Sequence, residues 1–257
     1  MTFSLFDLSG QVAIVTGSSK GIGQAVAERL AEHGARVAIS SRNAEPCESV
    51  SAALNARHGA GTSIAVAASI SSKEALDHLV AETTERLGPV SILICNAASN
   101  PYYGSMSGIS DAQFRKVLDN NILSNHWLVQ RVAPGMIARR EGAIVFVSSI
   151  AGIRGTETIG AYGISKAADM QLARNLAVEL GPFGIRVNSV APGVIRTDFS
   201  KALWEDPALR LRSEAKTPLR RFGEPDDVAG IVVSLASPAG RYVTGQTIVI
   251  DGGDTIA

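Results

Sequence analysis

A tyrosine and a lysine lie four residues apart in the stretch AYGISKAADM, residues 161–170, where most neighbours are small or apolar. On a helix, Tyr162 and Lys166 would project from the same face, because residues four apart lie one turn from each other. A free tyrosine has a pKa of about 10 and is a poor base near neutral pH, but a nearby ammonium favours the phenolate. The pair could therefore exchange a proton with a substrate. An amphipathic surface pair is the ordinary alternative.

A second feature with chemical meaning is the glycine-rich stretch TGSSKGIG, residues 16–23. Gly17 permits a tight turn, Gly21 lets a pyrophosphate approach the backbone, and Gly23 allows a helix to pack closely on a strand. The N-terminus of the helix that follows favours phosphate charge. The spacing Gly-x-x-x-Gly-x-Gly differs from the usual Gly-x-Gly-x-x-Gly, and a plain turn is the alternative.

These residues need a scaffold, and short β-branched runs alternate with longer segments of helical periodicity along the whole chain. Such alternation predicts an α/β protein: a single-domain Rossmann fold with a doubly wound parallel sheet and helices on both faces. No linker or charge block interrupts residues 1–257, so we expect one domain. The expected strands are residues 12–16, 36–40, 62–68, 91–95, 143–148, 185–190 and 247–253. Ligands of such sheets bind beyond the carboxyl ends of the strands.

Composition excludes several classes of function. The 24 basic and 24 acidic side chains balance, so no net field attracts nucleic acid. Apolar runs stay far below the roughly 18 residues of a membrane-spanning helix, so we expect no membrane partner. The two cysteines and four histidines lack the spacing of a metal site. With no signal peptide in the N-terminal residues, we expect a cytoplasmic protein.

Five motifs occur in an order and spacing that resemble the classical short-chain dehydrogenases/reductases over essentially the whole chain. They are TGSSKGIG (16–23), CNAA (95–98), VSS (147–149), YGISK (162–166) and APGVIRTD (191–198). The resemblance implies an oxidoreductase that moves a hydride between a nicotinamide cofactor and a carbonyl/alcohol substrate.

The resemblance also implies four catalytic residues. Tyr162 would be the general acid in reduction and the base in oxidation, and Lys166 would lower its pKa and bind the nicotinamide ribose. Ser149 would hydrogen-bond the substrate oxygen. Asn121 would fix a water that links Lys166 to solvent; Asn120 is its adjacent rival, and the family's Asp-x-Asn register selects Asn121. Taken singly, Ser149 and Asn121 could also be a capping hydroxyl and a helix residue with a local hydrogen bond.

The cofactor contacts implied by the resemblance come from every strand end near the site. They are Gly17, Ser19, Lys20, Gly21, Ile22, Gly23, Ser41, Arg42, Ser69, Ile70, Asn96, Ala97, Tyr162, Lys166, Pro192, Gly193, Ile195 and Thr197. Two positions depart from the family: Ser69 replaces the usual aspartate near adenine, and Ala98 replaces a glycine.

The end of the second expected strand bears on the coenzyme. Ser41 stands where an acidic residue would bind the ribose 2′-hydroxyl of NAD, and Arg42 and Lys20 suit a 2′-phosphate. We therefore predict NADP(H). The alternative is that both cations are ordinary solvated side chains.

Residues 197–218 have the composition of a lid over the substrate, with Phe199, Leu203, Trp204 and Leu209 as its apolar side chains. An opposite wall could come from Tyr102, Tyr103, Ile150 and Ile153. Such walls suit an apolar ketone or aldehyde. Packing against the body or another subunit is the alternative.

Three stretches, CNAASNPYYGS, PGVIRTDFSKALWED and RRFGEPDDVAGIV, resemble the branch of NADPH-dependent carbonyl and retinal reductases. A 3-oxoacyl-thioester reductase of the same family and a non-catalytic NADP(H)-binding sensor are the alternatives, although such sensors typically lose the tyrosine or lysine that this chain retains. The segment YVTGQTIVIDGG resembles the family's C-terminal strand, which implies a homotetramer.

Overall fold

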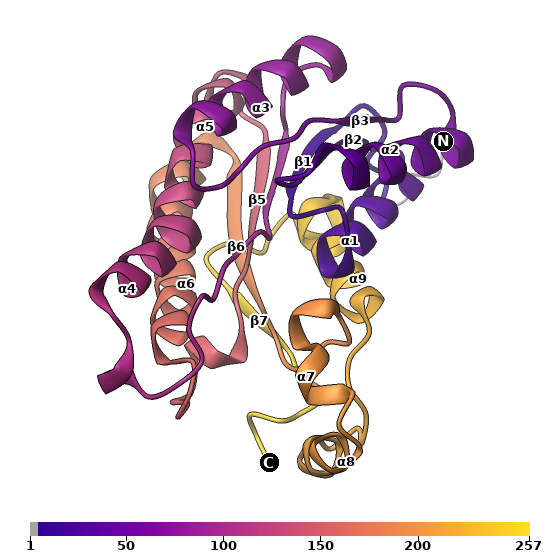
Figure 1. Cartoon of the computed structure of the whole chain (residues 1–257). Coiled ribbons are helices and arrows are strands. Elements are labelled where there is room, and N and C mark those ends of the chain that lie inside the picture. Colours follow the sequence, from indigo (N-terminus) through magenta and orange to yellow (C-terminus); the bar gives the residue numbers. More distant parts are fainter. Residues whose placement is uncertain (1–4) are drawn as a thin grey trace.

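Seven strands form one parallel sheet in the order β3-β2-β1-β4-β5-β6-β7, as seen in the computed structural model (Figure 1). The structure describes residues 5–257, except the side chains of Ala202 and Leu203. The strands are β1 Val12–Thr16, β2 Arg36–Ser40, β3 Ser63–Ala65, β4 Ile92–Cys95, β5 Gly142–Val147, β6 Ile185–Pro192 and β7 Thr247–Ile250. The strand order reverses direction between β1 and β4, which is the switch point where such sheets bind ligands.

All seven expected strands exist, but five have different ends. The fourth begins at Ile92 instead of residue 91, and the fifth spans Gly142–Val147 instead of 143–148. The third is only three residues long, at the sheet edge, instead of spanning 62–68. The last ends at Ile250, because Gly252 and Gly253 turn the chain with φ of 63° and 92°. The sixth continues to Pro192, which is still paired with Ile250.

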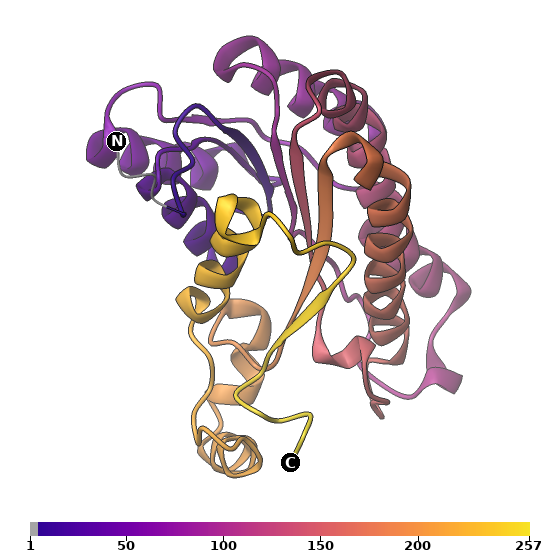
Figure 2. The same cartoon turned by 180° about the vertical axis from the view of Figure 1, so that it is seen from behind.

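Helices cover both faces of the sheet (Figures 1 and 2). They are α1 Gly21–Glu32, α2 Ala44–His58, α3 Lys73–Leu87, α4 Asp111–Leu118, α5 Ser124–Arg139, α6 Gly160–Leu180, α7 Lys201–Trp204, α8 Pro207–Lys216 and α9 Pro225–Ala236. One face packs against α1, α2 and α9, and the other against α3, α5 and α6. The predicted doubly wound Rossmann fold is therefore confirmed.

Strand β1 explains why its sequence is apolar at every position. Ala13 and Val15 are buried with the helices of one face, whereas Val12 and Ile14 are buried with those of the other. A strand covered on both sides loses the apolar–polar alternation of a half-exposed strand. The short runs that the sequence offers as strands are thus central strands of a covered sheet.

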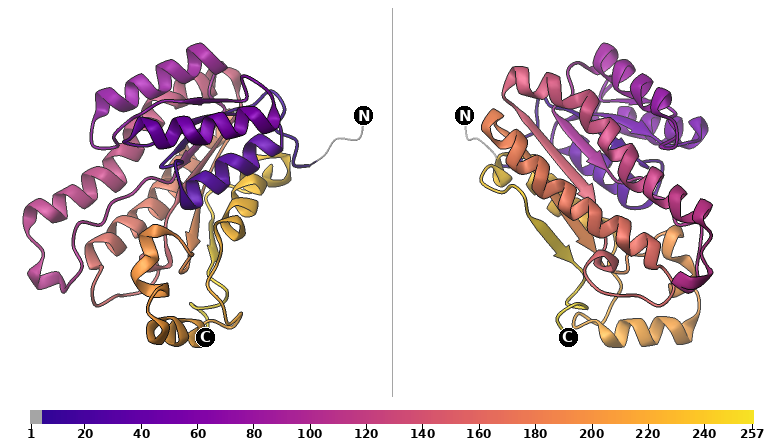
Figure 3. Two further views of the ribbon diagram at one scale, coloured as in Figure 1. Left: turned by 45° about the vertical axis from the view of Figure 1, so that its right-hand side comes forward. Right: turned by 90° about the vertical axis from the view of Figure 1, so that its left-hand side faces the viewer.

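The segment between β6 and α9 lies beyond the carboxyl end of the sheet and carries the short helices α7 and α8 (Figure 3). The chain end lies beside it, since the Leu219 amide donates to the Gly252 carbonyl at 3.1 Å. Among the described residues, no helix combines the length and the apolar character that crossing a bilayer requires.

Candidate active site

The loop between β1 and α1 has the conformation that its glycines predict. Gly17 and Gly21 have φ of 66° and 60°, which side chains rarely tolerate. A Cβ atom at Gly23 would lie 2.4 Å from the Gly17 carbonyl oxygen and 2.5 Å from Asn96 Nδ2. The loop backbone is therefore packed too tightly for any side chain at position 23.

Asn96 and Ala97 hold the start of this loop from the end of β4. Asn96 Nδ2 donates to the carbonyl oxygens of Thr16 and Gly17 at 2.9 and 3.2 Å. Thr16 Oγ1 accepts the backbone N–H groups of Asn96 and Ala97, each at 3.1 Å. Thr16 was not among the expected site residues; its signal is a hydroxyl at the end of a buried strand, directly before the glycines.

These features fit a dinucleotide pyrophosphate. The glycines leave the backbone accessible, the first turn of α1 carries no acidic side chain, and the helix N-terminus supplies N–H groups and positive dipole charge. Ser19 is half-buried in the loop, and Ile22 packs on the core beneath it.

The end of β2 carries the residues expected at the adenosine ribose. Ser41 Oγ donates to the Asn43 carbonyl at 3.2 Å and lies 3.1 Å from Cys47 Sγ. Arg42 is exposed and makes no ion pair with the described residues. After β3, Ser69 Oγ lies 2.8 Å from Ser71 Oγ, and Ile70 packs on the core.

Lys20 was expected to be a cation available to a 2′-phosphate, but it forms an ion pair. Its Nζ is 2.8 Å from Asp198 Oδ2, and both side chains are exposed. The ion pair joins the glycine loop to the beginning of the lid segment. A bound phosphate would compete with Asp198 for Lys20.

Helix α6 presents Tyr162 and Lys166 on one buried face. Only 9% of Tyr162 and 2% of Lys166 are exposed, which excludes the surface-pair alternative. Lys166 Nζ lies 5.6 Å from the centre of the Tyr162 ring and donates to the Val147 carbonyl at 2.8 Å and Asp169 Oδ2 at 3.0 Å. A phenol and an ammonium are thus held together at the ends of the central strands.

The protonation of this pair differs in one respect from the sequence expectation. Burial raises the pKa of Tyr162 and outweighs the lowering by Lys166, while Asp169 raises this pKa further and a hydrogen bond with Ser149 lowers it. Burial lowers the pKa of Lys166, but Asp169 and Tyr162 overcome that effect and raise it. Lys166 acts in the expected direction on Tyr162, yet without cofactor the tyrosine remains a phenol.

Asn121 reaches α6 because a π-helix, Asp119–Leu123, precedes α5. Its Nδ2 donates to Ser165 Oγ at 3.0 Å and to the Ser99 carbonyl at 3.1 Å, and its Oδ1 accepts the Ser99 N–H at 2.8 Å. Asn120 instead donates to Ser99 Oγ. The structure therefore brings Asn121, and not its neighbour, to the tyrosine helix.

Ser149 follows β5 and begins a 3-10 turn, Ile150–Gly152. Its Oγ accepts the Ala151 N–H at 3.1 Å, which is the capping role considered as the alternative. The same hydroxyl also lies within hydrogen-bonding reach of Tyr162. The Ser149 hydroxyl therefore caps the 3-10 turn and also lies in the candidate site.

The segment after β6 lies against the glycine loop. A Cβ at Gly21 would meet Thr197 Cγ2 at 3.2 Å, and one at Gly193 would meet Asp251 Cα at 2.9 Å. Ile195 is buried, and its carbonyl accepts the Ser200 hydroxyl. Pro192 ends β6, and of Pro192, Gly193, Ile195 and Thr197 it is Thr197 that lies against the glycine loop, at Gly21.

Of the expected apolar residues, Phe199 lies beside Tyr162, with ring centres 5.9 Å apart. Trp204 Nε1 is tied to the Thr197 carbonyl at 3.0 Å. Ile150 is buried, whereas Leu209, Ile153 and Tyr103 are exposed. Tyr102 is half-buried, with its hydroxyl donating to the Ser105 carbonyl; the side chain of Leu203 lies outside the described residues.

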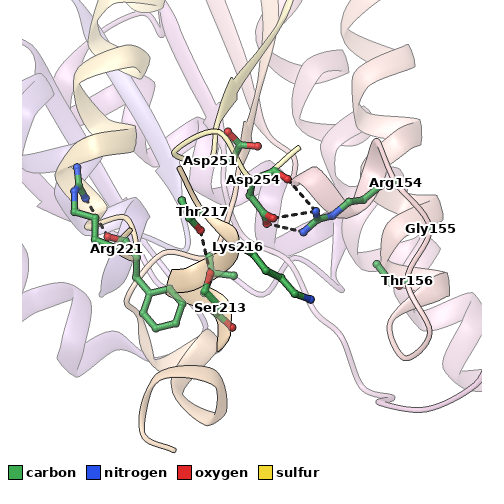
Figure 4. Close-up of a pocket in the computed structure, with 11 residues that line it drawn as sticks. Arg154, Gly155, Thr156, Ser213, Lys216, Thr217, Arg221, Asp251 and Asp254 are labelled. Carbon is green, nitrogen blue, oxygen red and sulfur yellow. Dashed lines mark hydrogen bonds and ion pairs between the residues drawn. The ribbon is translucent and has the colours of Figure 1, made fainter. Parts of the chain in front are cut away.

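A cavity of about 400 Å³ opens between the lid, the loop before α6 and the chain end (Figure 4). Val194 and Phe222 line it together with a majority of polar residues. Arg154 crosses from the loop before α6 to Asp254, with Nη2 2.6 Å from Oδ2. The Thr156 hydroxyl on this wall is shielded from solvent and has no hydrogen-bond partner among the described residues.

Fold, glycine loop and tyrosine–lysine helix together define a nicotinamide-dependent oxidoreductase of the Rossmann class. A family model described as enoyl-(acyl carrier protein) reductase matches residues 17–255. The chain belongs to the short-chain dehydrogenases/reductases.

Relatives by sequence and by structure agree with this family. The chain is 41% identical to the Bos taurus dehydrogenase/reductase SDR family member 4 over 247 residues, 96% of this chain and 88% of that protein. It is 42% identical to the human dehydrogenase/reductase SDR family member 2, mitochondrial, over 249 residues with the same coverage. These relatives agree with the branch that the three sequence stretches indicate.

Two solved structures illustrate the similarity of fold. A gluconate 5-dehydrogenase from Burkholderia cenocepacia, in complex with NADP and tartrate, superposes with a TM-score of 0.93 at 29% identity, covering 98% of each chain. A short-chain type dehydrogenase/reductase from Mycobacterium marinum gives 0.91 at 34% identity, again over 98% of each chain.

Proposed function

We propose that this protein is an NADP(H)-dependent carbonyl reductase that interconverts an apolar ketone or aldehyde and the corresponding alcohol. The observation that carries the proposal is the buried face of α6, where Tyr162 and the ammonium of Lys166 lie together beside Ser149. A sensor that only binds cofactor has no need of a buried phenol–ammonium pair, whose desolvation is costly.

The cofactor would be held by the glycine loop and α1, by Ser41 and Arg42 after β2, and by the segment Pro192–Thr197. When bound, it supplies the hydride. Ser149 orients the carbonyl oxygen, and Tyr162 gives that oxygen a proton from its hydroxyl. Lys166 stabilises the resulting phenolate, and Asn121 keeps the turn of α6 with Tyr162 in place.

NADP(H) is favoured over NAD(H) by the charges after β2. Ser41, Arg42 and Asn43 include no carboxylate that would repel a 2′-phosphate, and the guanidinium of Arg42 is exposed and uncommitted among the described residues. Lys20, in the glycine loop, would add a second cation if Asp198 releases it.

The substrate's apolar part would contact Phe199, whose ring faces the Tyr162 ring at 5.9 Å while 67% of its surface remains exposed. An exposed aromatic ring beside the proton donor gains most from covering by an apolar ligand.

A second candidate substrate is a polyhydroxy acid. The polar residues of the 400 Å³ cavity include Arg154, Lys216 and Thr156, whose hydroxyl has no partner among the described residues, and they favour a ligand with hydroxyl and carboxylate groups. A similar solved structure is named as a gluconate 5-dehydrogenase and holds tartrate.

The test measures consumption of NADPH, and separately of NADH, with aromatic ketones, retinal-like aldehydes, acyl-thioesters and keto-sugar acids. We expect turnover of the apolar carbonyls with NADPH that disappears in Tyr162→Phe. Turnover of keto-sugar acids alone would select the second candidate, and turnover of acyl-thioesters alone would identify a 3-oxoacyl reductase. NADPH binding without turnover of any substrate would contradict the proposed reductase.

We also propose a homotetramer. Ile164 and Val178 are exposed apolar side chains on α6, and Val249 is exposed on β7 at the sheet edge. Apolar helix faces and open edge strands are common surfaces for self-association. Light scattering coupled to size-exclusion chromatography tests the subunit count, and a monomeric mass would contradict it.

A further inference from the structure

A buried carboxylate lies behind the tyrosine–lysine pair, three residues after Lys166. None of the Asp169 side chain is exposed. Asp169 Oδ2 accepts from Lys166 Nζ at 3.0 Å, and its Oδ1 accepts from Asn125 Nδ2 at 2.9 Å. Removing a charge from water is costly unless it is paired and hydrogen-bonded, and here both oxygens have a donor.

Asn125 connects this carboxylate to the opposite helix. It lies on α5, is 3% exposed, and its Nδ2 also donates to the Asn121 carbonyl at 2.7 Å. The amide therefore spans from the π-helix that carries Asn121 to the carboxylate on α6. Its geometry fixes which way the carboxylate faces.

The ammonium of Lys166 is held by two acceptors on different elements, Asp169 on α6 and the Val147 carbonyl on β5. An ammonium has three N–H donors. Two of the Lys166 N–H groups donate to Asp169 and Val147, so the third can donate to another group in the site.

The charges around this ammonium are few. Tyr162 and Asp169 face it from α6, and the Cys95 thiol faces it from β4. Burial raises the pKa of the Cys95 thiol, so the thiol is uncharged at neutral pH. Among the described groups, Asp169 is the one that offsets the lysine charge.

We propose that Asp169, oriented by Asn125, is a positioning residue that fixes the Lys166 ammonium against Val147 and offsets part of its positive field at the Tyr162 hydroxyl. The inference rests on the proposed function for the role of Tyr162 as proton donor. An offset field leaves the proton on Tyr162 through neutral pH, which is the form that carbonyl reduction requires.

The test compares the wild type with Asp169→Asn, which has the same shape and no charge. The ionisation of Tyr162 is followed in the cofactor-free protein by near-ultraviolet tyrosinate absorbance, with Tyr162→Phe subtracted to remove the other tyrosines. We expect the Tyr162 midpoint in Asp169→Asn to lie lower by about one pH unit or more. Glu179→Gln removes a charge from the exposed end of the same helix and is the matched control, expected to leave the midpoint unchanged.

An unchanged or raised midpoint in a folded Asp169→Asn protein would overturn the inference, because a merely structural aspartate would not move it downwards. If Asp169→Asn does not fold, the Tyr162 midpoint of the wild-type protein tests the inference instead. A wild-type midpoint clearly below the value of about 10 for free tyrosine would show an uncompensated lysine and reject the proposal. The titration needs no turnover, so its result stands even if Tyr162→Phe shows that the proposed reductase function is wrong.

Discussion

The side-chain amide of Asn121 donates to Ser165 Oγ at 3.0 Å, and Ser165 Oγ donates in turn to the Tyr162 carbonyl at 2.7 Å. The first bond crosses from the π-helix to α6. A π-helix widens one turn and changes the direction of its side chains relative to a continuous α-helix. This local irregularity lets a residue between α4 and α5 support the turn of α6 that carries Tyr162.

Replacing Asn121 by alanine is therefore expected to reduce kcat/KM for carbonyl reduction by about 100-fold. The Ser99 N–H would lose its acceptor and α6 its support. Asn120→Ala is the control, because Asn120 contacts only the Ser99 hydroxyl among these groups. Steady-state kinetics of both variants check this, and equal losses would contradict the assignment of Asn121.

The pH dependence of the two directions should be opposite. The pKa of Tyr162 is raised by burial, against Lys166, so the phenol persists to higher pH than in an exposed tyrosine. Reduction uses the phenol, so its kcat/KM should stay level through neutral pH and fall only above about 10, the ordinary pKa of tyrosine. Oxidation of the alcohol uses the phenolate and should rise over the same interval. Rates measured in both directions test this, and a fall in reduction already near neutral pH would contradict it.

The fold, the glycine loop and the placement of Tyr162 beside Lys166 were predictable because each rests on a local pattern. Apolar runs such as Val12–Thr16 predict covered strands, and Gly17, Gly21 and Gly23 sit where the backbone tolerates no larger residue. The supporting contacts were not predictable. Thr16 meets Asn96 across 80 sequence positions, and only strand order brings them together.

Asp169 is an example of a buried charge whose environment the sequence does not predict. Its spacing from Lys166 is visible in the sequence, and a charge on an otherwise apolar stretch of helix is unusual. Its partner Asn125 is 44 positions away, on another helix. Without that contact, the sequence could not separate a buried ion pair from a surface charge.

Arg42 should control the choice of coenzyme. Arg42→Ala is expected to raise KM for NADPH by about 10-fold or more, the loss of one charge-assisted contact to phosphate, while KM for NADH stays the same. Arg57→Ala is the matched control, since Arg57 is an exposed arginine at the far end of α2. Parallel KM measurements with both coenzymes check this. Equal KM values for NADPH and NADH in the wild type would contradict the NADP(H) preference itself.

Gly23 should be intolerant of even one methyl group. In Gly23→Ala the new Cβ would overlap the Gly17 carbonyl oxygen and Asn96 Nδ2, at 2.4 and 2.5 Å, so the loop and the side chain that clamps it must both move. We expect the free energy of unfolding to fall by about 1–3 kcal/mol and NADPH binding to weaken strongly. Gly181→Ala is the matched control: Gly181 has helical φ and ψ of −54° and −42° and nothing within 4 Å of a Cβ, so alanine should be neutral or slightly stabilising. Urea unfolding and NADPH fluorescence titration measure the two effects. A Gly23→Ala protein that binds NADPH as the wild type does would mean that the glycine loop is not the pyrophosphate site.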